Sequence, residues 1–421
     1  MRRFVSLSRL FVIAAVMITV SWLASINVGL HRPRRVETAI AQLRFLSSSL
    51  DGGGATGMQA VFPEGFVFTW ALYGLAEAEV ARALPRSDAR RSVALARARI
   101  AVERVLSDDA RKPFALEMQP PCGAFYASWS LYLRSVVLRA TDTGDPAPFD
   151  LVQYEQDCDA FAAVLAGSES PFLPSYPDAV WPADTVMGVA ALAIHGQVLD
   201  SRYDLLIARW LEDVDERLDP ELGAISHVAD AIDGMPRGGA RGGSLALMSR
   251  TLVDVDSALA RRQYEILRRH FVDYAWGIPG VREYPHGVDG PGDIDSGPLV
   301  FGFAGPATVV GLGAAIAHGD EELASSLLAT PDMTGFPIEL AGQRRYAGGL
   351  VPVGDAFLAW ARTTPAGPRT TAYPPIMPAW WRLPFHAVSA VASALMLVMS
   401  FGVGRRRRSG RPSTRPARRA A

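Results

Sequence analysis

The chain has 421 residues, of which 49% are hydrophobic and 20% charged, so it is long and apolar enough to bury a large core. The formal net charge is −1, which excludes the overall positive field on which nucleic-acid binding depends. Positive charge is concentrated at the two ends of the chain, next to long apolar segments.

The first apolar segment covers residues 10–30 and contains no charged side chain. At about 1.5 Å per residue, a helix of this length crosses a hydrocarbon core of about 30 Å. A cleaved signal peptide is the alternative, but its apolar region is shorter, about 7–15 residues, and ends at a small-residue site. No A-x-A site follows residue 30, so the sequence favours an uncleaved anchor.

A second uncharged segment, residues 383–403, ends against the run Arg405-Arg406-Arg407-Arg408. Basic residues beside a span stay in the cytoplasm, so both termini are expected there and the main domain on the periplasmic or extracytoplasmic side. Membrane lipids are therefore expected partners, and nucleic acid is not. The predicted organisation is a short cytoplasmic N-terminus (1–9), a transmembrane helix (10–30), a main domain (36–365), a linker (366–382), a second transmembrane helix (383–403) and an Arg-rich cytoplasmic tail (404–421).

Between the two spans the pattern is helical, with little period-2 alternation that would indicate strands. Apolar or amphipathic stretches joined by turn-rich segments predict twelve helices. They lie near 36–49, 63–84, 88–107, 122–140, 149–166, 180–198, 202–217, 240–253, 256–274, 297–317, 320–329 and 350–362.

Every second helix follows a segment rich in Gly, Pro and aromatic residues, and these segments recur at intervals of about 52–62 residues. The helices that follow them are rich in Ala, Gly, Leu and Val, which suits an inner ring, whereas the intervening helices carry Arg, Glu and Asp. The expected fold is all-α, an (α/α)6 toroid of six helical hairpins whose inner helices all begin at the same end. An α-solenoid is the alternative, but its repeats would be shorter and more alike.

Five blocks resemble, in order, blocks of the linalool dehydratase/isomerase-like family, whose fold is an (α/α)6 barrel. They are FVFTWALYGLA (66–76), YPDAVWPADT (176–185), WLEDVDERLDPELGAI (210–225), REYPHGVDGPGDIDSGP (282–298) and RRYAGGLVPVGDAFLAW (344–360). The resemblance implies a site at the openings of the inner helices. Where the linalool enzyme has two active-site cysteines, this chain has Ser175 and Asp184, and Ala124 stands where that enzyme has an active-site histidine. An acidic pair matches Asp293 and Asp295.

Four residues are candidates for proton transfer. Asp184 follows Trp181 and Pro182, and an apolar cavity would raise its pKa, as a general acid requires. Asp293 and Asp295 can hold one protonated and one ionised group. Helix capping is the alternative for all three acids, and a Ca²⁺ cluster is a further one for the pair, which offers too few ligands. His286 titrates near neutral pH, although a surface position is the alternative.

Other side chains near the openings are predicted to contact substrate. Arg241 can anchor an anion at a helix start, and aromatic rings can stack on a sugar or line an apolar pocket, with core packing as the alternative. The predicted substrate-binding set is Glu64, Trp70, Tyr126, Trp129, Ser175, Trp181, Arg241, Glu283 and Tyr346. No cofactor or metal is predicted, and Cys122 and Cys158 have no metal-binding spacing but could pair as a disulfide in an oxidising compartment.

The sequence thus predicts a membrane-anchored enzyme facing the exterior that uses carboxylate acid–base chemistry of lyase or isomerase type. The resemblance implies an isoprenoid-like or lipid-linked alcohol as substrate. One alternative is a glycoside hydrolase or epimerase acting on an envelope glycan, by analogy of fold. Another is a non-catalytic ligand-binding or assembly protein, in which the acids would be scattered helix caps. The sequence carries no signal for an oligomeric state.

Overall fold

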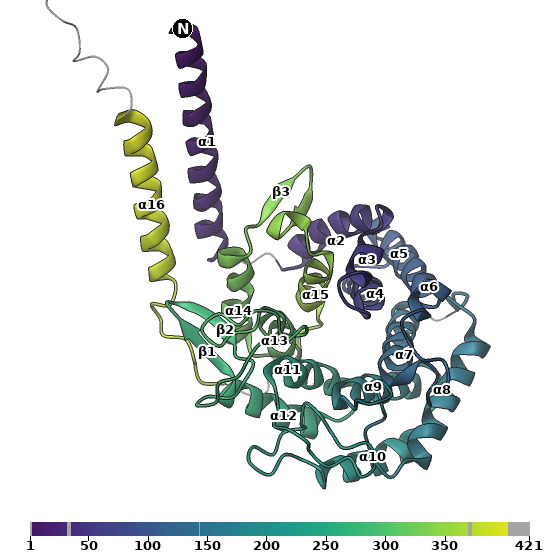
Figure 1. The fold of residues 1–421 in the computed structure, drawn as a ribbon. Coiled ribbons are helices and arrows are strands. Elements are labelled where there is room, and N and C mark those ends of the chain that lie inside the picture. Colours follow the sequence, from purple (N-terminus) through teal and green to yellow (C-terminus); the bar gives the residue numbers. More distant parts are fainter. Residues whose placement is uncertain (1, 32–34, 143, 369–372, 403–421) are drawn as a thin grey trace, which may run out of the picture. The chain divides into compact units, whose positions relative to one another are not determined.

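The computed structural model (Figure 1) describes residues 2–31, 35–142, 144–368 and 373–402, and these residues are mostly helical. The chain divides into two compact units. One comprises Met1–Pro33, Trp276–Ile278 and Ala379–Ala421, and the other comprises Arg34–Ala275 and Pro279–Pro378.

The first unit contains the two apolar helices expected near the ends of the chain, α1 (Arg2–Gly29) and α16 (Leu383–Gly402). Their stretches Leu10–Gly29 and Leu383–Ser400 are long and apolar enough to cross a membrane. The helices pack on each other, and Asn27 Nδ2 donates to Ser389 Oγ at 2.9 Å. The expected Arg-rich tail lies outside the described residues.

The other helices lie in the second unit. They are α2 (Arg35–Asp51), α3 (Gly54–Gln59), α4 (Gly65–Ala83), α5 (Ala89–Val105), α6 (Asp108–Arg111), α7 (Gly123–Ala140), α8 (Leu151–Gly167), α9 (Pro182–Val198), α10 (Asp204–Asp215), α11 (Gly242–Thr251), α12 (Ser257–His270), α13 (Gly305–Ala317), α14 (Glu321–Thr334) and α15 (Pro352–Thr363). Short 3₁₀ turns follow at Leu252–Asp254 and Ala347–Gly349, and two antiparallel hairpins are formed by β1 (Val272–Ala275) with β2 (Ile278–Val281) and β3 (Ile338–Leu340) with β4 (Gln343–Arg345).

Six helices of the second unit contact one another in a closed cycle. The order is α4, α7, α9, α11, α13, α15 and back to α4. Figure 1 shows them around the middle of this unit, with α2, α5, α8, α10, α12 and α14 outside them. The cycle skips every second long helix, which matches the alternation of small apolar and charged helices in the sequence.

Small residues let the inner helices approach closely. A Cβ on Gly188 of α9 would lie 2.6 Å from Ser128 Oγ of α7 and would overlap the Phe161 ring of α8 even more closely. A Cβ on Gly74 of α4 would lie 2.6 Å from the Ala101 Cβ of α5. The interior tolerates no such overlap, because it is packed at near-crystalline density.

Farther along the same inner helices, buried ion pairs add polar contacts between them. Arg139 of α7 lies 3.5 Å from Glu79 of α4 and 2.6 Å from Asp254, which ends the 3₁₀ turn after α11. Tyr132 donates to the other Asp254 oxygen at 3.2 Å. The three segments are thus joined by charge as well as by packing. Cys122 and Cys158 are both buried and free, so the disulfide considered from the sequence is not formed.

The positions of the twelve expected helices are mostly confirmed, but the helix expected from residue 297 begins at Gly305. Positive φ angles at Gly297, Phe301 and Gly302 keep this stretch out of the helical region. Asp293 and Asp295 therefore lie in a loop well before α13, and not at the N-terminus of that helix.

Short elements are the other difference from the sequence-based expectation. The helix expected at 256–274 ends at His270, and a hairpin follows whose turn has positive φ at Trp276 and Gly277. The β3–β4 hairpin and the short helices α3 and α6 were likewise not expected. Elements of three to six residues carry too little periodicity to detect.

Candidate functional site

The beginnings of several inner helices are joined by direct contacts. Ala124 N of α7 donates to Pro174 O, in the loop before α9, at 2.8 Å. Gly242 N of α11 donates to Glu283 O, in the segment before α13, at 2.9 Å. Tyr176, also before α9, hydrogen-bonds through its hydroxyl to Glu64 at the start of α4. The openings of α4, α7 and α9 therefore lie together, and that of α11 lies beside the segment before α13.

These contacts bring together five carboxyl groups, here called the acid cluster: Glu64, Asp184, Glu283, Asp293 and Asp295. The charges of Glu64 and Asp295 both act on Asp184, and those of Asp293 and Asp295 both act on Glu283. The five groups come from three separate segments of the chain. The acids singled out from the sequence thus lie near one another.

Asp184 is the most deeply buried of the three aspartates, with 6% of its surface exposed. Trp181 is the N-cap of α9, so Asp184 stands in the first turn and is not a cap. Its Oδ2 instead accepts a 2.6 Å hydrogen bond from Ser175 Oγ. Burial raises the Asp184 pKa to about 7, and the charge of Asp295 adds to this effect, while Ser175 and the Trp129 indole oppose it. Asp184 is therefore partly protonated at neutral pH.

Asp293 and Asp295 have different surroundings. Asp293 Oδ1 accepts hydrogen bonds from the backbone N of Asp295 at 3.1 Å and of Ser296 at 2.9 Å, and Asp293 also pairs with Arg241. Burial disfavours the Asp293 carboxylate, but the Ser296 and Arg241 contacts outweigh it and lower the Asp293 pKa. Asp293 thus fixes the turn of its loop and caps no helix.

Asp295 accepts no side-chain hydrogen bond from the described residues. Its side chain is accessible to solvent, yet surrounding protein atoms reduce its hydration. This loss raises the Asp295 pKa to about 6, with the charges of Asp293 and Glu64 as further causes. A group that is both solvent-accessible and poorly hydrated is typical of the wall of a hollow, so Asp295 can meet a ligand.

Arg241 supplies the positive charge of the site. Its Nη1 lies 3.8 Å from Glu283 Oε1, in addition to the Asp293 pair. Glu283 is 4% exposed, and burial followed by the charge of Asp293 raises its pKa to about 7. His227 contacts Ser244 through Nδ1, and burial together with Arg241 lowers the His227 pKa to about 4. His227 is therefore neutral here at neutral pH.

Tyr176 was not singled out from the sequence, although it lies directly after Ser175. Burial, followed by its hydrogen bond to Glu64, raises the Tyr176 pKa far above its usual range, so the phenol stays protonated. Its ring centroid lies 5.1 Å from that of Trp181 and 6.4 Å from that of Phe125. The only sequence signal was its place next to Ser175 in a block that opens an inner helix. His227 lies in a long irregular loop and had no signal.

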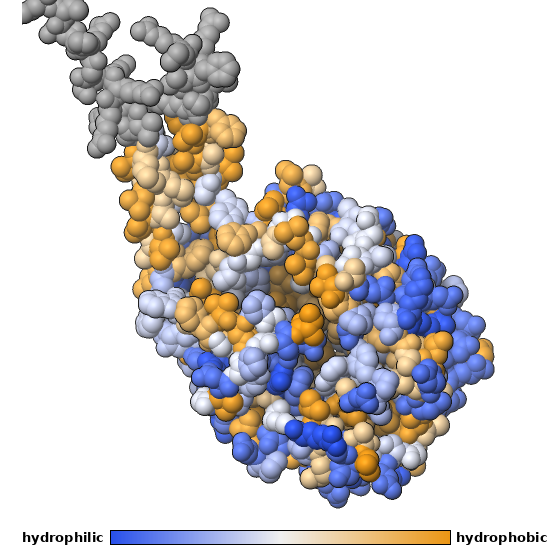
Figure 2. All heavy atoms as spheres, in the orientation of Figure 1, coloured by the Kyte–Doolittle hydropathy of each residue, from blue (hydrophilic) through white to orange (hydrophobic). Residues whose placement is uncertain are grey.

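Aromatic rings form an apolar group beside these segments. The ring of Phe68 lies 5.0 Å from those of Phe125 and Trp129 and 5.4 Å from that of Phe357, so α4, α7 and α15 all contribute. Trp129 is fully buried, and its indole acts on the Asp184 carboxylate. Figure 2 shows a hollow with apolar walls on the visible face of the second unit.

Four of the residues predicted from the sequence to form the site lie outside the acid cluster. The exposed His286 is 3.7 Å from Asp273, and Trp70 packs under the Arg104 guanidinium at 5.8 Å. The Tyr126 hydroxyl donates to Val105 O at 2.9 Å, toward α5. Tyr346 belongs to a separate buried network with Arg344, Asp332 and Arg362. The structure thus shows a surface position for His286 and core packing for Trp70, Tyr126 and Tyr346.

A possible metal-binding group lies away from the acid cluster. Glu155, His195 and Asp200 place ligand atoms within 4.8 Å of one another. Arg202 already pairs with both carboxylates, at 3.4 Å from Glu155 and 2.5 Å from Asp200. A side-chain cation thus already supplies the positive charge that a metal ion would bring.

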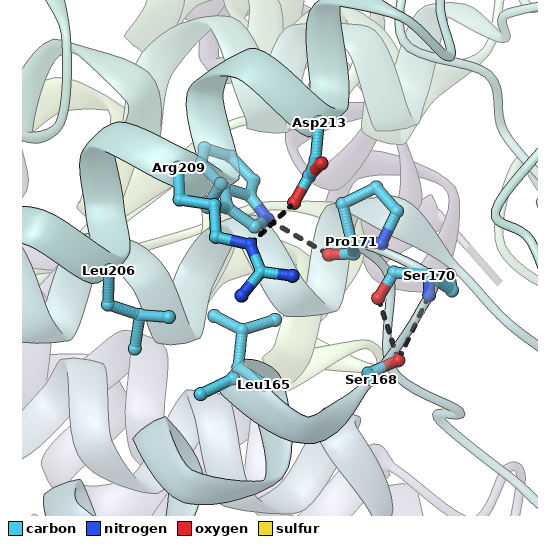
Figure 3. Close-up of a pocket in the computed structure, with 9 residues that line it drawn as sticks. Leu165, Ser168, Ser170, Pro171, Leu206, Arg209 and Asp213 are labelled. Carbon is cyan, nitrogen blue, oxygen red and sulfur yellow. Dashed lines mark hydrogen bonds and ion pairs between the residues drawn. The ribbon is translucent and has the colours of Figure 1, made fainter.

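A shallow depression, open to solvent, lies between α8 and α10, and Figure 3 shows the residues that line it. Trp210 Nε1 donates to Pro171 O at 2.9 Å, and Arg209 lies 3.7 Å from Asp213. The polar groups there satisfy one another, and no member of the acid cluster lines the depression. The depression therefore lacks the clustered carboxyl groups that suggest a catalytic role for the acid cluster.

No protein-family model matches the chain, and no curated protein matches it at a significant level.

Replacing Asp184 by Asn should change how stability depends on pH. The folded Asp184 pKa is raised from 3.8 to about 7, so ionisation costs the wild type stability as pH rises between these values, by about 4 kcal/mol at most. Asn has no such cost. The melting temperature of Asp184→Asn relative to wild type should therefore rise from pH 4 to pH 8, as measured by thermal unfolding. A difference that stays constant across this range would contradict the buried acid.

Proposed function

We propose that the second unit is an (α/α)6 toroid whose inner ring is α4, α7, α9, α11, α13 and α15. The closed cycle of helix contacts and the outer position of the intervening helices support this proposal. We further propose that α1 and α16 anchor it in a membrane, with both termini cytoplasmic and the toroid on the extracytoplasmic side. The two long apolar helices and the arginines beside the second one support the anchoring.

We propose that the acid cluster performs acid–base chemistry of lyase or isomerase type on an isoprenoid-like or lipid-linked alcohol. The observation that carries this proposal is the pairing of Asp184, pKa about 7, with Asp295, pKa about 6. Near pH 6.5 a substantial fraction of such a pair has Asp184 protonated and Asp295 ionised, because the two groups titrate in that order. This is the state that proton donation and proton removal at one site require.

In the proposed reaction, Asp184 gives its proton to the hydroxyl of the substrate, the C–O bond breaks, and water leaves. Asp295 then takes a proton from the neighbouring carbon, whose C–H electron pair forms the double bond. The products are an alkene and water. The water carries the proton from Asp184, Asp295 holds the proton taken from carbon, and a proton passes from Asp295 to Asp184 through solvent before the next turnover. If water then adds to the alkene, with the hydroxyl at a different carbon, the product is an isomer of the starting alcohol.

The aromatic group suits the charge that develops in such a step. Faces of Trp and Phe rings attract a cation within about 6 Å. Trp129 and Phe68 lie next to each other, and Trp129 also acts on the Asp184 carboxylate. A substrate with a hydroxyl at the acids and a hydrocarbon chain along these rings would match both parts of the site.

The resemblance to the linalool dehydratase/isomerase-like family implies the fold and the place of the site, and the site residues differ from those of the linalool enzyme. Ser175 and Asp184 stand in place of the two cysteines, and in this protein they hydrogen-bond to each other. We infer that this serine–aspartate pair replaces the cysteines in a different reaction step, the donation of a proton by Asp184.

One observation favours a glycan as the alternative substrate. The rings of Tyr176 and Trp181 stand next to the acids, and such rings stack on sugar faces. Hydrolysis or epimerisation would use the same carboxyl groups. A non-catalytic binding protein is disfavoured, because Asp184, Glu283 and Asp295 are clustered and do not cap helices.

The test is turnover by the full-length protein in membranes, with a panel of prenyl alcohols and envelope glycans and with mass spectrometry of the products. We expect a prenyl alcohol to lose the mass of water or to isomerise. Asp295→Asn should lower this turnover about 10²-fold or more. Asp289→Asn, in the same loop but fully solvent-facing, should not. Turnover of glycans alone would overturn the proposed substrate class, and full activity of Asp295→Asn would remove that residue from the mechanism.

A further inference from the structure

The connection from α14 to α15 exposes an unusual set of large apolar side chains. The exposed fractions are 66% for Phe336, 41% for Ile338, 67% for Leu340, 80% for Leu350 and 49% for Val351. All three residues of β3 are exposed. Isolated apolar side chains are normal on a protein surface, but several on one short connection indicate a contact surface.

Two arginines without an ion-pair partner contact this connection. Arg44 of α2 donates to Gly342 O, in the turn between β3 and β4, at 3.5 Å. The guanidinium of Arg345, the last residue of β4, lies 5.8 Å from the ring centroid of Phe45. Neither Arg44 nor Arg345 forms an ion pair with any described residue, whereas their neighbour Arg344 pairs with Asp332 at 2.7 Å. The hairpin thus combines exposed apolar side chains with two positive charges, one at its turn and one at its open end.

This pattern fits the surface of a membrane with anionic lipids. Apolar side chains enter the boundary between headgroups and acyl chains, while arginines remain at the level of the phosphates. The hairpin packs on α2, where Gln343 Nε2 donates to Ser48 Oγ at 3.0 Å.

We propose that the connection 336–351, with Arg44, is a contact site for an anionic lipid surface. This connection combines exposed apolar side chains with two arginines that pair with no described acid, and it leads directly into α15, which carries Phe357 of the aromatic group. The inference rests on the proposed membrane anchoring but not on the proposed chemistry.

The test places an environment-sensitive fluorophore on single introduced cysteines in the full chain, reconstituted in nanodiscs. Leu340→Cys and Leu350→Cys report on the connection. Leu205→Cys on α10, 88% exposed, is the matched control. The native Cys122 and Cys158 are 2% and 0% exposed, so unsubstituted protein gives the labelling background. Brominated lipids quench a probe in the membrane, and iodide quenches a probe in water.

We expect lipid quenching at 340 and 350 to exceed that at 205 at least twofold, and to increase when phosphatidylglycerol replaces part of the phosphatidylcholine. Arg44→Gln with Arg345→Gln should remove that increase while the melting temperature is kept. Iodide quenching at 340 and 350 equal to that at 205 would overturn the proposal. So would protection from iodide without lipid quenching, because a protein partner or a second copy would then cover the site. No substrate is needed, so this outcome is independent of the proposed reaction.

Discussion

Asp184→Asn is expected to lower turnover of the prenyl alcohol about 10²–10⁴-fold while the protein stays folded. Asn can keep the hydrogen bond from Ser175 but cannot release a proton. The loss should therefore appear in kcat, since the group acts on bound substrate. Steady-state kinetics in membranes measure it, with Asp178→Asn as the control, because Asp178 is an exposed acid in the same block. Equal activity of Asp184→Asn and wild type would mean that Asp184 donates no proton.

The pH dependence of the wild type follows from the same two groups. Activity should fall below about pH 6, where Asp295 becomes protonated, and above about pH 7, where Asp184 ionises. The Asp184→Asn variant should lack the upper limb.

Gly188→Ala is expected to destabilise the packing between α7, α8 and α9. The added methyl would lie 2.6 Å from Ser128 Oγ and would overlap the Phe161 ring. Phe161 is 1% exposed and has little room to move. Overpacking of this kind costs about 1–3 kcal/mol, more than the gain of up to about 1 kcal/mol in helix propensity. Thermal unfolding should show a melting temperature several degrees below that of wild type.

Gly196→Ala is the matched control in the same helix. The nearest atom to its added Cβ would be Asp204 Oδ1, at the ordinary contact distance of 3.4 Å. This variant should keep or raise the melting temperature, because the helix propensity gain is not offset. If both variants behave alike, α7, α8 and α9 are not packed as closely as the structure has them.

The helices could be predicted because their signals are local. Small apolar stretches that alternate with charged ones located twelve long helices, and the segments rich in Gly, Pro and aromatic residues before every second helix located the acids. Asp184, Asp295 and Arg241 were found because they stand in these segments. The position of α13 was wrong because Phe301 adopts a left-handed conformation that its residue type does not signal.

The partners within the site could not be predicted, since they depend on contacts between distant segments. Tyr176 and Glu64 meet across 112 positions of the sequence. Arg241 selects Asp293 and not Asp295 because the Asp293 oxygens are fixed by the Ser296 turn. Trp70, Tyr126 and Trp129 are all aromatic residues near the start of an inner helix, so the sequence does not distinguish them. In the structure the side chains of Trp70 and Tyr126 contact α5, whereas Trp129 belongs to the aromatic group.

A structure of the Asp184→Asn protein with a bound prenyl alcohol decides most directly whether separate helix openings share one pocket for this chemistry. We predict the alcohol oxygen within hydrogen-bond distance of both the introduced asparagine amide and the Asp295 carboxylate, and the hydrocarbon chain against Phe68, Trp129 and Phe357. A ligand bound at the depression between α8 and α10, or a middle filled by aliphatic side chains, would contradict this assignment.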